Sequence, residues 1–224
     1  MNLSGLLPAL RSLPEYQSAR EAIEPERRSL ALNLPRAARP PVIAALAEDC
    51  RRPTLVVAAR VDRALTLAEE IGVWSPAARV LLFGEPNPLF YEYEVWGPRT
   101  IRSRITALAA LASPQSQVHS PESPSSVVAR SSFVTRSGHS SLIVVASARA
   151  LMTRTLPQRD FLANTRIVEA GQSVRLEKLI ETWVGAGYTA ETIVVEPGQF
   201  SRRGGLIDIF PTADDAPVRL ALFG

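Results

Sequence analysis

The chain has 224 residues, of which 46% are apolar and 21% are charged, and its formal net charge at pH 7 is +3. This composition excludes a wholly disordered chain, and no apolar run approaches the roughly 20 residues needed to cross a bilayer. One cysteine, Cys50, and two histidines, His119 and His139, exclude a disulfide framework and argue against a structural zinc site. The amino terminus has neither a basic leader nor a long apolar stretch, so we expect no signal peptide, no membrane association and a cytoplasmic protein.

Helix and strand patterns alternate through the first part of the chain. Apolar residues at helical spacing predict a buried helix between Arg36 and Cys50. A continuous apolar run at 55–59 predicts a strand, and the helix after it is expected to be capped by Asp62 and to end at Gly72. The pattern then repeats as a strand, a helix and a third strand, at residues 80–83, 101–111 and 142–146. Such alternation predicts an α/β domain, with helices on the faces of a parallel sheet.

The segment 113–140 interrupts this pattern before the third strand. It contains ten serines and three prolines in 28 residues and shows no apolar periodicity. We therefore expect a disordered insertion. Because both histidines lie in this segment, a catalytic role for either is disfavoured.

A different order of elements follows Met152. A helix around 176–183 is expected to precede three strands with no further helix between them, at residues 192–195, 205–210 and 218–223. Strands joined by short links pair antiparallel, so this part is predicted to be a small α+β unit. We expect two domains, 1–150 and 151–224, with the boundary near 150–157.

The stretch 33–40 is the place where an α/β domain of this kind would carry a phosphate-binding loop. It has no glycine, lysine, serine or threonine, and Pro40 and Pro41 remove two N–H donors that a helix start would offer to an anion. The chain also has no Gly-x-Ser-x-Gly nucleophile elbow. We therefore predict no catalytic, cofactor-binding or metal-binding residues.

Two charged features each allow a structural and a functional interpretation. Asp208 stands in an otherwise apolar strand, where it is expected to face either solvent or an arginine. A basic region between Arg99 and Arg154 has seven arginines against the single acid Glu122, and it is either a solvated surface or a nucleic-acid face. Aromatic side chains that could stack on bases are nearly absent from it. Its arginines are Arg99, Arg102, Arg104, Arg130, Arg136, Arg149 and Arg154.

The most specific motif is the sequence EPGQFSRRGGLIDIFP at 196–211, which PVRLALFG follows at 217–224. Together these segments resemble the amino-terminal region of the bacterial transcription-repair coupling factor family, Mfd, which is related to the excision-repair protein UvrB. Shorter segments are similar to the family's degenerate phosphate loop, to its second and third strands and to a Gly-Tyr pair, at 34–39, 79–83, 142–151 and 187–188. The resemblance covers most of the chain outside the serine-rich insertion.

The resemblance implies an α/β subdomain with the UvrB outline, of a degenerate P-loop type without nucleotide binding and with an incomplete parallel sheet. It also implies a small inserted α+β subdomain that docks the repair protein UvrA and so recruits damage recognition to a stalled RNA polymerase. The motif arginine of the docking surface corresponds to Arg203, and we include its neighbours Arg202 and Phe200 as partner-binding residues. RNA polymerase binding and ATP-driven DNA translocation are implied only for domains outside this chain.

The chain departs from the family pattern at two places. Thr189 stands where members often have a basic residue after Gly-Tyr, so part of the docking charge is expected to be missing. The chain also stops at Phe223-Gly224, so we expect either a fragment of a longer protein or a truncated gene product.

Three hypotheses about function follow. The leading one is a non-catalytic docking module of nucleotide-excision repair with UvrA as its partner. The alternative is a nucleic-acid-binding module that uses the basic region between Arg99 and Arg154, with DNA as its partner and an affinity that falls steeply with salt. The third is a small α/β enzyme with an unrecognised site.

Overall fold

The computed structural model describes residues 2–23, 29–86, 96–112, 141–165, 168, 171–214 and 216–222. The predicted insertion at 113–140, with both histidines, lies outside the described residues. The chain divides into two compact units, the first made of Met1–Tyr91 and Ser137–Thr153 and the second of Glu92–Arg136 and Arg154–Gly224. The division into domains 1–150 and 151–224 stays a prediction.

Short helices open the first unit and pack on the longer helix that follows them. They are η1 (Ser4–Leu6), α1 (Leu7–Arg11), α2 (Pro14–Ile23) and η2 (Arg36–Ala38), ahead of α3 (Arg39–Cys50). Leu7 and Tyr16 bury their side chains against Ala45 of α3. Arg11 and the Tyr16 hydroxyl both donate hydrogen bonds to Asp49, at 3.0 and 2.7 Å, so a polar contact fixes the same packing.

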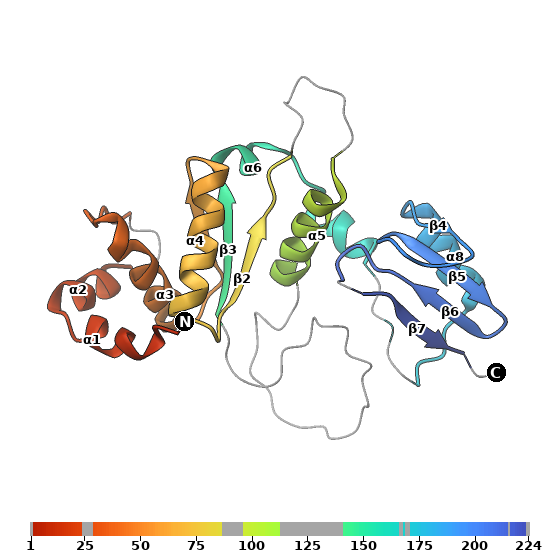
Figure 1. Ribbon diagram of the computed structural model, residues 1–224, viewed down its shortest axis with the longest axis horizontal. Helices are drawn as coiled ribbons and strands as arrows, with labels where there is room; N and C mark the ends of the chain where they lie inside the picture. The colour runs from red at the N-terminus through yellow and green to blue at the C-terminus, as the bar shows by residue number, and fades with distance from the viewer. Residues whose placement is uncertain are drawn as a thin grey trace. The chain divides into compact units, whose positions relative to one another are not determined.

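The first unit contains a parallel sheet with the strand order β1-β3-β2. Its strands are β1 (Thr54–Ala58), β2 (Arg79–Phe83) and β3 (Leu142–Ser147), and α6 (Ala148–Met152) follows β3. Between β1 and β2, α4 (Val61–Trp74) lies against β2 and β3 (Figure 1). The core is formed by small and aliphatic residues of α3, α4, β1 and β3, namely Ala44, Ala47, Ala58, Ala64, Leu67, Ile71, Ile143 and Val145. The predicted α/β sheet with flanking helices is confirmed.

Two details of α4 differ from the prediction. The helix continues past Gly72 to Trp74, because a helical glycine costs only about 1 kcal/mol and Trp74 at the end of the helix packs against the core. The residue at the N-cap is Arg60 and not Asp62. Asp62 lies in the first turn, where its carboxylate accepts a hydrogen bond from Arg60 Nε at 3.0 Å and where a negative charge favours the helix dipole.

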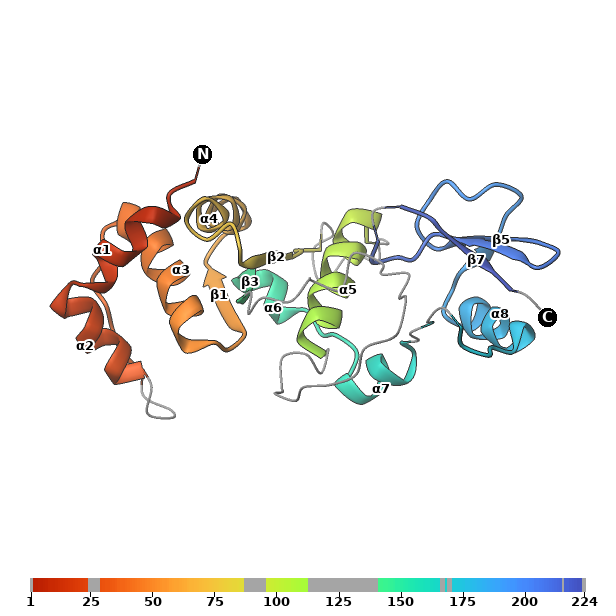
Figure 2. The ribbon, with the colours of Figure 1, turned by 90° about the horizontal axis from the view of Figure 1, so that it is seen from below.

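The second unit contains a four-stranded sheet whose strands follow one another in chain order. They are β4 (Thr189–Ala190), β5 (Gln199–Arg203), β6 (Leu206–Ile209) and β7 (Val218–Ala221), and the helices of this unit are α5 (Pro98–Ala112), α7 (Gln158–Ala163) and α8 (Leu176–Gly185). β5, β6 and β7 pair antiparallel as predicted, whereas β4 pairs parallel with β5. α8 lies on one side of the sheet (Figure 2), where Leu179 and Trp183 form a core with Phe200, Ile207 and Ile209. The predicted small α+β unit is confirmed.

The strand predicted at 192–195 is wrong, and β5 was not predicted as a strand. After β4 the chain leaves the sheet and returns only at Gln199. The reason is that the N–H groups of Val195 and Glu196 donate to the Gln199 side-chain oxygen, both at 2.9 Å, and not to a neighbouring strand. An apolar sequence run predicts a strand, but a side chain that accepts its backbone N–H groups can hold it as a loop.

The helix predicted at 101–111 is α5, and it belongs to the second unit. Thr106 Oγ1 donates a hydrogen bond at 3.2 Å to the carbonyl of Ala213, in the connection between β6 and β7. Apolar spacing predicts such a helix but not the unit on which it packs. Among the described residues, no helix combines the length and the apolar character required to span a membrane.

Candidate docking surface

The side of the second sheet that faces away from α8 is called the outer face below. Side chains alternate along a strand, and residues paired across neighbouring strands share a face. Phe200 and Ile209 are paired and lie in the core with α8, so the next pair, Ser201 and Asp208, belongs to the outer face. The same register places on the outer face Arg203, Leu206 and Arg219.

Asp208 and Arg219 form a bidentate ion pair on this face. Arg219 donates from Nε to Oδ1 at 2.6 Å and from Nη2 to Oδ2 at 2.9 Å. The hydrogen bonds from Arg219 lower the pKa of Asp208, and the positive charge of Arg203 acts in the same direction. The prediction that Asp208 faces an arginine or solvent is therefore confirmed, with Arg219 as the arginine.

Arg203 is exposed on the outer face and is tied to the loop at 192–196, which we call the apolar loop. Its Nη2 donates to the carbonyl oxygen of Thr192 at 2.8 Å, and Ser201 Oγ donates to the same oxygen at 3.1 Å. This acceptor is neutral, and the nearby Asp208 carboxylate is already held by both bonds to Arg219. Arg203 therefore keeps its positive charge and further N–H donors available at the surface.

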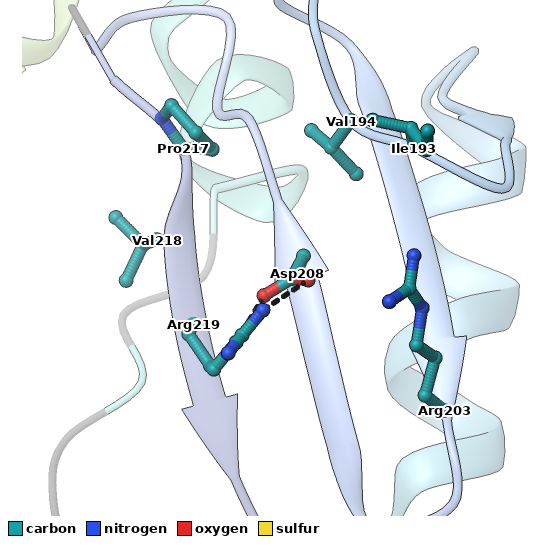
Figure 3. Close-up of a pocket in the computed structure, with 7 residues that line it drawn as sticks. All are labelled: Ile193, Val194, Arg203, Asp208, Pro217, Val218 and Arg219. Atoms are coloured by element: carbon teal, nitrogen blue, oxygen red, sulfur yellow. Dashed lines mark hydrogen bonds and ion pairs between the residues drawn. The ribbon is translucent and has the colours of Figure 1, made fainter.

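An open hollow of about 420 Å³ lies between Arg203 and the Asp208–Arg219 pair. Figure 3 shows the two arginines and Asp208 along the strands, with the ion pair between β6 and β7. The residues that line it are Ile193, Val194, Arg203, Asp208, Pro217, Val218 and Arg219. The hollow thus combines an apolar wall with charged groups.

The three residues predicted to bind a partner do not share one surface. Phe200 is only 4% exposed and its ring packs 5.6 Å from that of Trp183, so it supports the sheet from inside. Arg202 is exposed, but it pairs with the buried Ile207 and so belongs to the side of the sheet opposite to Arg203. Of the three, Arg203 alone lies on the outer face.

Sequence reasoning missed five residues of this surface, namely Ile193, Val194, Pro217, Val218 and Arg219. The signal for Arg219 was present, because Asp208 and Arg219 each interrupt an apolar strand and opposite charges often pair across strands. Ile193 and Val194 were assigned to a strand, and no sequence signal distinguishes them from strand residues.

The basic region between Arg99 and Arg154 is not one exposed surface in the described part of the chain. Arg104 is only 3% exposed and its guanidinium carbon lies 5.0 Å from the centre of the Trp96 ring, and burial lowers its pKa. Arg149 forms an ion pair with Glu85 at 3.1 Å. Arg130 and Arg136 lie outside the described residues.

The stretch predicted to be a degenerate phosphate loop forms η2 and the start of α3. Pro40 and Pro41 are buried in the first turn of α3 and have no N–H to donate. The Arg39 side chain donates to the carbonyl of Leu34 at 3.4 Å. This helix start therefore offers an anion fewer backbone donors than an ordinary one.

Comparison with known proteins identifies a domain in the second part of the chain. Residues 167–224 match the family model described as the UvrB interaction domain. The transcription-repair-coupling factor of Mycobacterium tuberculosis is 29% identical over 223 residues, 99% of this chain and 16% of that protein. The corresponding factor of Bacillus subtilis is 35% identical over 81 residues, 36% of this chain and 7% of that protein. UvrABC system protein B of Thermus thermophilus is 36% identical over 83 residues, 37% of this chain and 12% of that protein.

These similarities confirm the resemblance found in the sequence. The second part of the chain matches the model of the UvrB interaction domain, and the chain is similar over nearly its whole length to a transcription-repair-coupling factor. The similar region covers about a sixth of the Mycobacterium tuberculosis factor and a smaller share of the other two proteins. All seven residues that line the hollow lie within the segment that matches this domain model.

Proposed function

We propose that this chain is a docking module of nucleotide-excision repair and that the outer face of its second sheet binds UvrA. The observation that carries the proposal is the position of Arg203. It is exposed beside an open hollow, within the segment that matches the UvrB interaction domain. The relatives named as coupling factors and as UvrABC system protein B support a role in DNA repair.

In this role the chain itself catalyses no reaction. It acts as one part of a longer ATP-dependent DNA translocase, whose other domains contact RNA polymerase, and it recruits UvrA to the stalled enzyme. The similarity of the chain to about a sixth of a coupling factor supports this assignment. The function of the chain is therefore to link UvrA to the protein that contacts RNA polymerase. Such a function depends on the affinity of the contact and on its orientation.

The chemistry of Arg203 suits an interface anchor. Its planar guanidinium carries five N–H donors in a fixed arrangement, so it can bind a carboxylate in bidentate geometry. The bond to Thr192 holds the side chain in place before a partner arrives, which reduces the entropy lost on binding. Arginines in such positions are often the residues whose truncation costs an interface the most.

The test compares two neighbouring arginines by calorimetric titration of purified UvrA from the same organism. Arg203→Ala is expected to weaken binding tenfold or more, about 1.4 kcal/mol. Arg202→Ala is the matched control, because it removes the same charge from the opposite side of the sheet, and it is expected to change the affinity by less than about threefold. Equal losses for the two variants would contradict docking through the outer face and would point to a general effect of charge.

A further inference from the structure

We propose that the apolar loop at 192–196 is the second half of the docking surface, and that the partner meets it with an apolar side chain next to a carboxylate. The inference rests on the proposed function. It adds an apolar contact to the charged contact of Arg203. The apolar contact is driven by the burial of apolar surface and not by charge.

The exposure of this loop is the first reason. Ile193 is 66% exposed and Val195 is 67% exposed, although both side chains are β-branched and apolar. Val194, between them, lines the hollow beside Arg203. Contiguous apolar side chains rimmed by polar groups mark interaction sites, whereas isolated ones do not.

The loop is also held in one conformation by side chains of β5. The Gln199 oxygen accepts the N–H groups of Val195 and Glu196, and the carbonyl of Thr192 accepts from Ser201 and Arg203, so both ends of the loop are tied to the strand. In the free chain these hydrogen bonds satisfy backbone groups of the loop and leave its apolar side chains exposed. For binding, the order means that little conformational entropy remains to be lost.

The lining of the hollow defines the chemistry of the partner. Ile193, Val194 and Pro217 provide an apolar wall. On the charged side, Asp208 is neutralised by Arg219, so the positive charge of Arg203 is not balanced by this pair. A segment that presents an apolar side chain to the wall and a carboxylate to Arg203 satisfies both sides, whereas a purely acidic segment leaves the wall in water.

The test uses the full 224-residue chain and purified UvrA from the same organism. The variant is Ile193→Ser with Val195→Ser, and the matched control is Val184→Ser, which removes an equally β-branched side chain, 56% exposed, from α8. We expect the loop variant to bind at least tenfold more weakly with a less negative heat capacity of binding, because less apolar surface is buried. The control is expected to bind within about twofold of the wild type.

Salt distinguishes the two halves of the surface. Raising the ionic strength should weaken binding of the wild type and of the loop variant alike, and should weaken binding of Arg203→Ala less. Circular dichroism shows whether each variant is folded, and the single variant Ile193→Ser is the fallback if the double variant is not.

The possible outcomes separate this inference from the proposed function. Wild-type affinity in the folded loop variant, together with a loss in Arg203→Ala, would overturn the apolar half and leave the docking function standing. A weaker loop variant with an unchanged heat capacity of binding would overturn apolar burial as the cause. Absence of UvrA binding by the folded wild-type chain would overturn both proposals.

Discussion

Asp214 lies in the connection between β6 and β7 with only 6% of its surface exposed, and its Oδ1 atom has no hydrogen-bond partner among the described residues. Burial raises the pKa of its carboxyl group, and the charge of Arg102 offsets this only in part. Because the folded-state pKa lies above the unfolded-state value, the folded chain binds the proton more tightly. The ionised carboxylate therefore costs stability at neutral pH, and this cost disappears as the pH falls below the unfolded-state pKa.

Asp214→Asn removes the charge and keeps the shape of the side chain. It is expected to raise the free energy of unfolding at about pH 7 by on the order of 1 kcal/mol and to have little effect at about pH 3. Urea unfolding at the two pH values, followed by tryptophan fluorescence, measures the difference. An equal gain at both values would mean that the amide packs better and that the buried charge is not the cause.

Thr189 is the residue at which the resemblance leads us to expect a missing positive charge on the outer face. It pairs with Gln199, two residues before Ser201 on β5, so its side chain belongs to the outer face. Thr189→Arg is expected to tighten UvrA binding several-fold at low salt, with a smaller gain at high salt because charge is screened. Titrations at two ionic strengths check this, and a gain that does not depend on salt would exclude an electrostatic origin.

The environment of a single residue was predicted well where it depends on local chemistry. It was predicted poorly where it depends on which face of a strand the side chain occupies. A carboxylate in an apolar strand predicted that Asp208 would face an arginine or solvent, and in the structure it pairs with Arg219. Arg203 and Phe200 occupy the same motif, but the phase of β5 sends one outward and the other into the core. That phase depends on where the strand begins, and Gln199, the first residue of β5, follows a loop that was predicted to be a strand.

At the scale of elements, one glycine sets how closely two strands meet. A Cβ atom at Gly205 would lie 2.8 Å from the carbonyl oxygen of Leu222, and the carbonyl of Gly205 accepts the N–H of Leu222 at 2.8 Å. Gly205→Ala must therefore push the end of β7 away and is expected to lower the free energy of unfolding by about 1–3 kcal/mol.

Gly72→Ala is the control, because Gly72 is inside α4 and a Cβ there meets no atom within 4 Å. It is expected to raise the free energy of unfolding by about 0.5–1 kcal/mol, since alanine loses less backbone entropy in a helix. Urea unfolding compares both with the wild type. A Gly205→Ala chain as stable as the wild type would mean that β7 can shift without cost.

Most elements with an amphipathic or apolar signal were predicted correctly, whereas β5, which lacks such a signal, was not, and the apolar run at 192–195 does not form the strand predicted for it. The strands of the parallel sheet, with α3, α4 and α8, follow from apolar spacing within the segment itself. β5 carries Arg202 and Arg203 and forms because β6 supplies its hydrogen-bond partners. The apolar loop is the opposite case. Its sequence predicts a strand, but hydrogen bonds to Gln199 hold it away from the sheet.

At the scale of the whole chain, strands that alternate with helices predicted an α/β part, and the run of strands after them predicted an α+β part. Both sheets are present. The assignment of α5 to the second unit could not be predicted, because its contact with Ala213 joins residues 107 positions apart. The motif at 196–211 lies within the segment that matches the family model, but the proposed docking surface also includes Ile193, Val194 and Arg219, which only the folded sheet brings together.

The measurement that tests the account most directly is titration of the folded wild-type chain into UvrA from the same organism at near-physiological salt, beside a titration into duplex DNA. We expect saturable binding to UvrA and no saturable binding to DNA, because Arg104 is buried and Arg149 is paired with Glu85. Binding to DNA that falls steeply with salt, with none to UvrA, would contradict the docking function and favour a nucleic-acid-binding module.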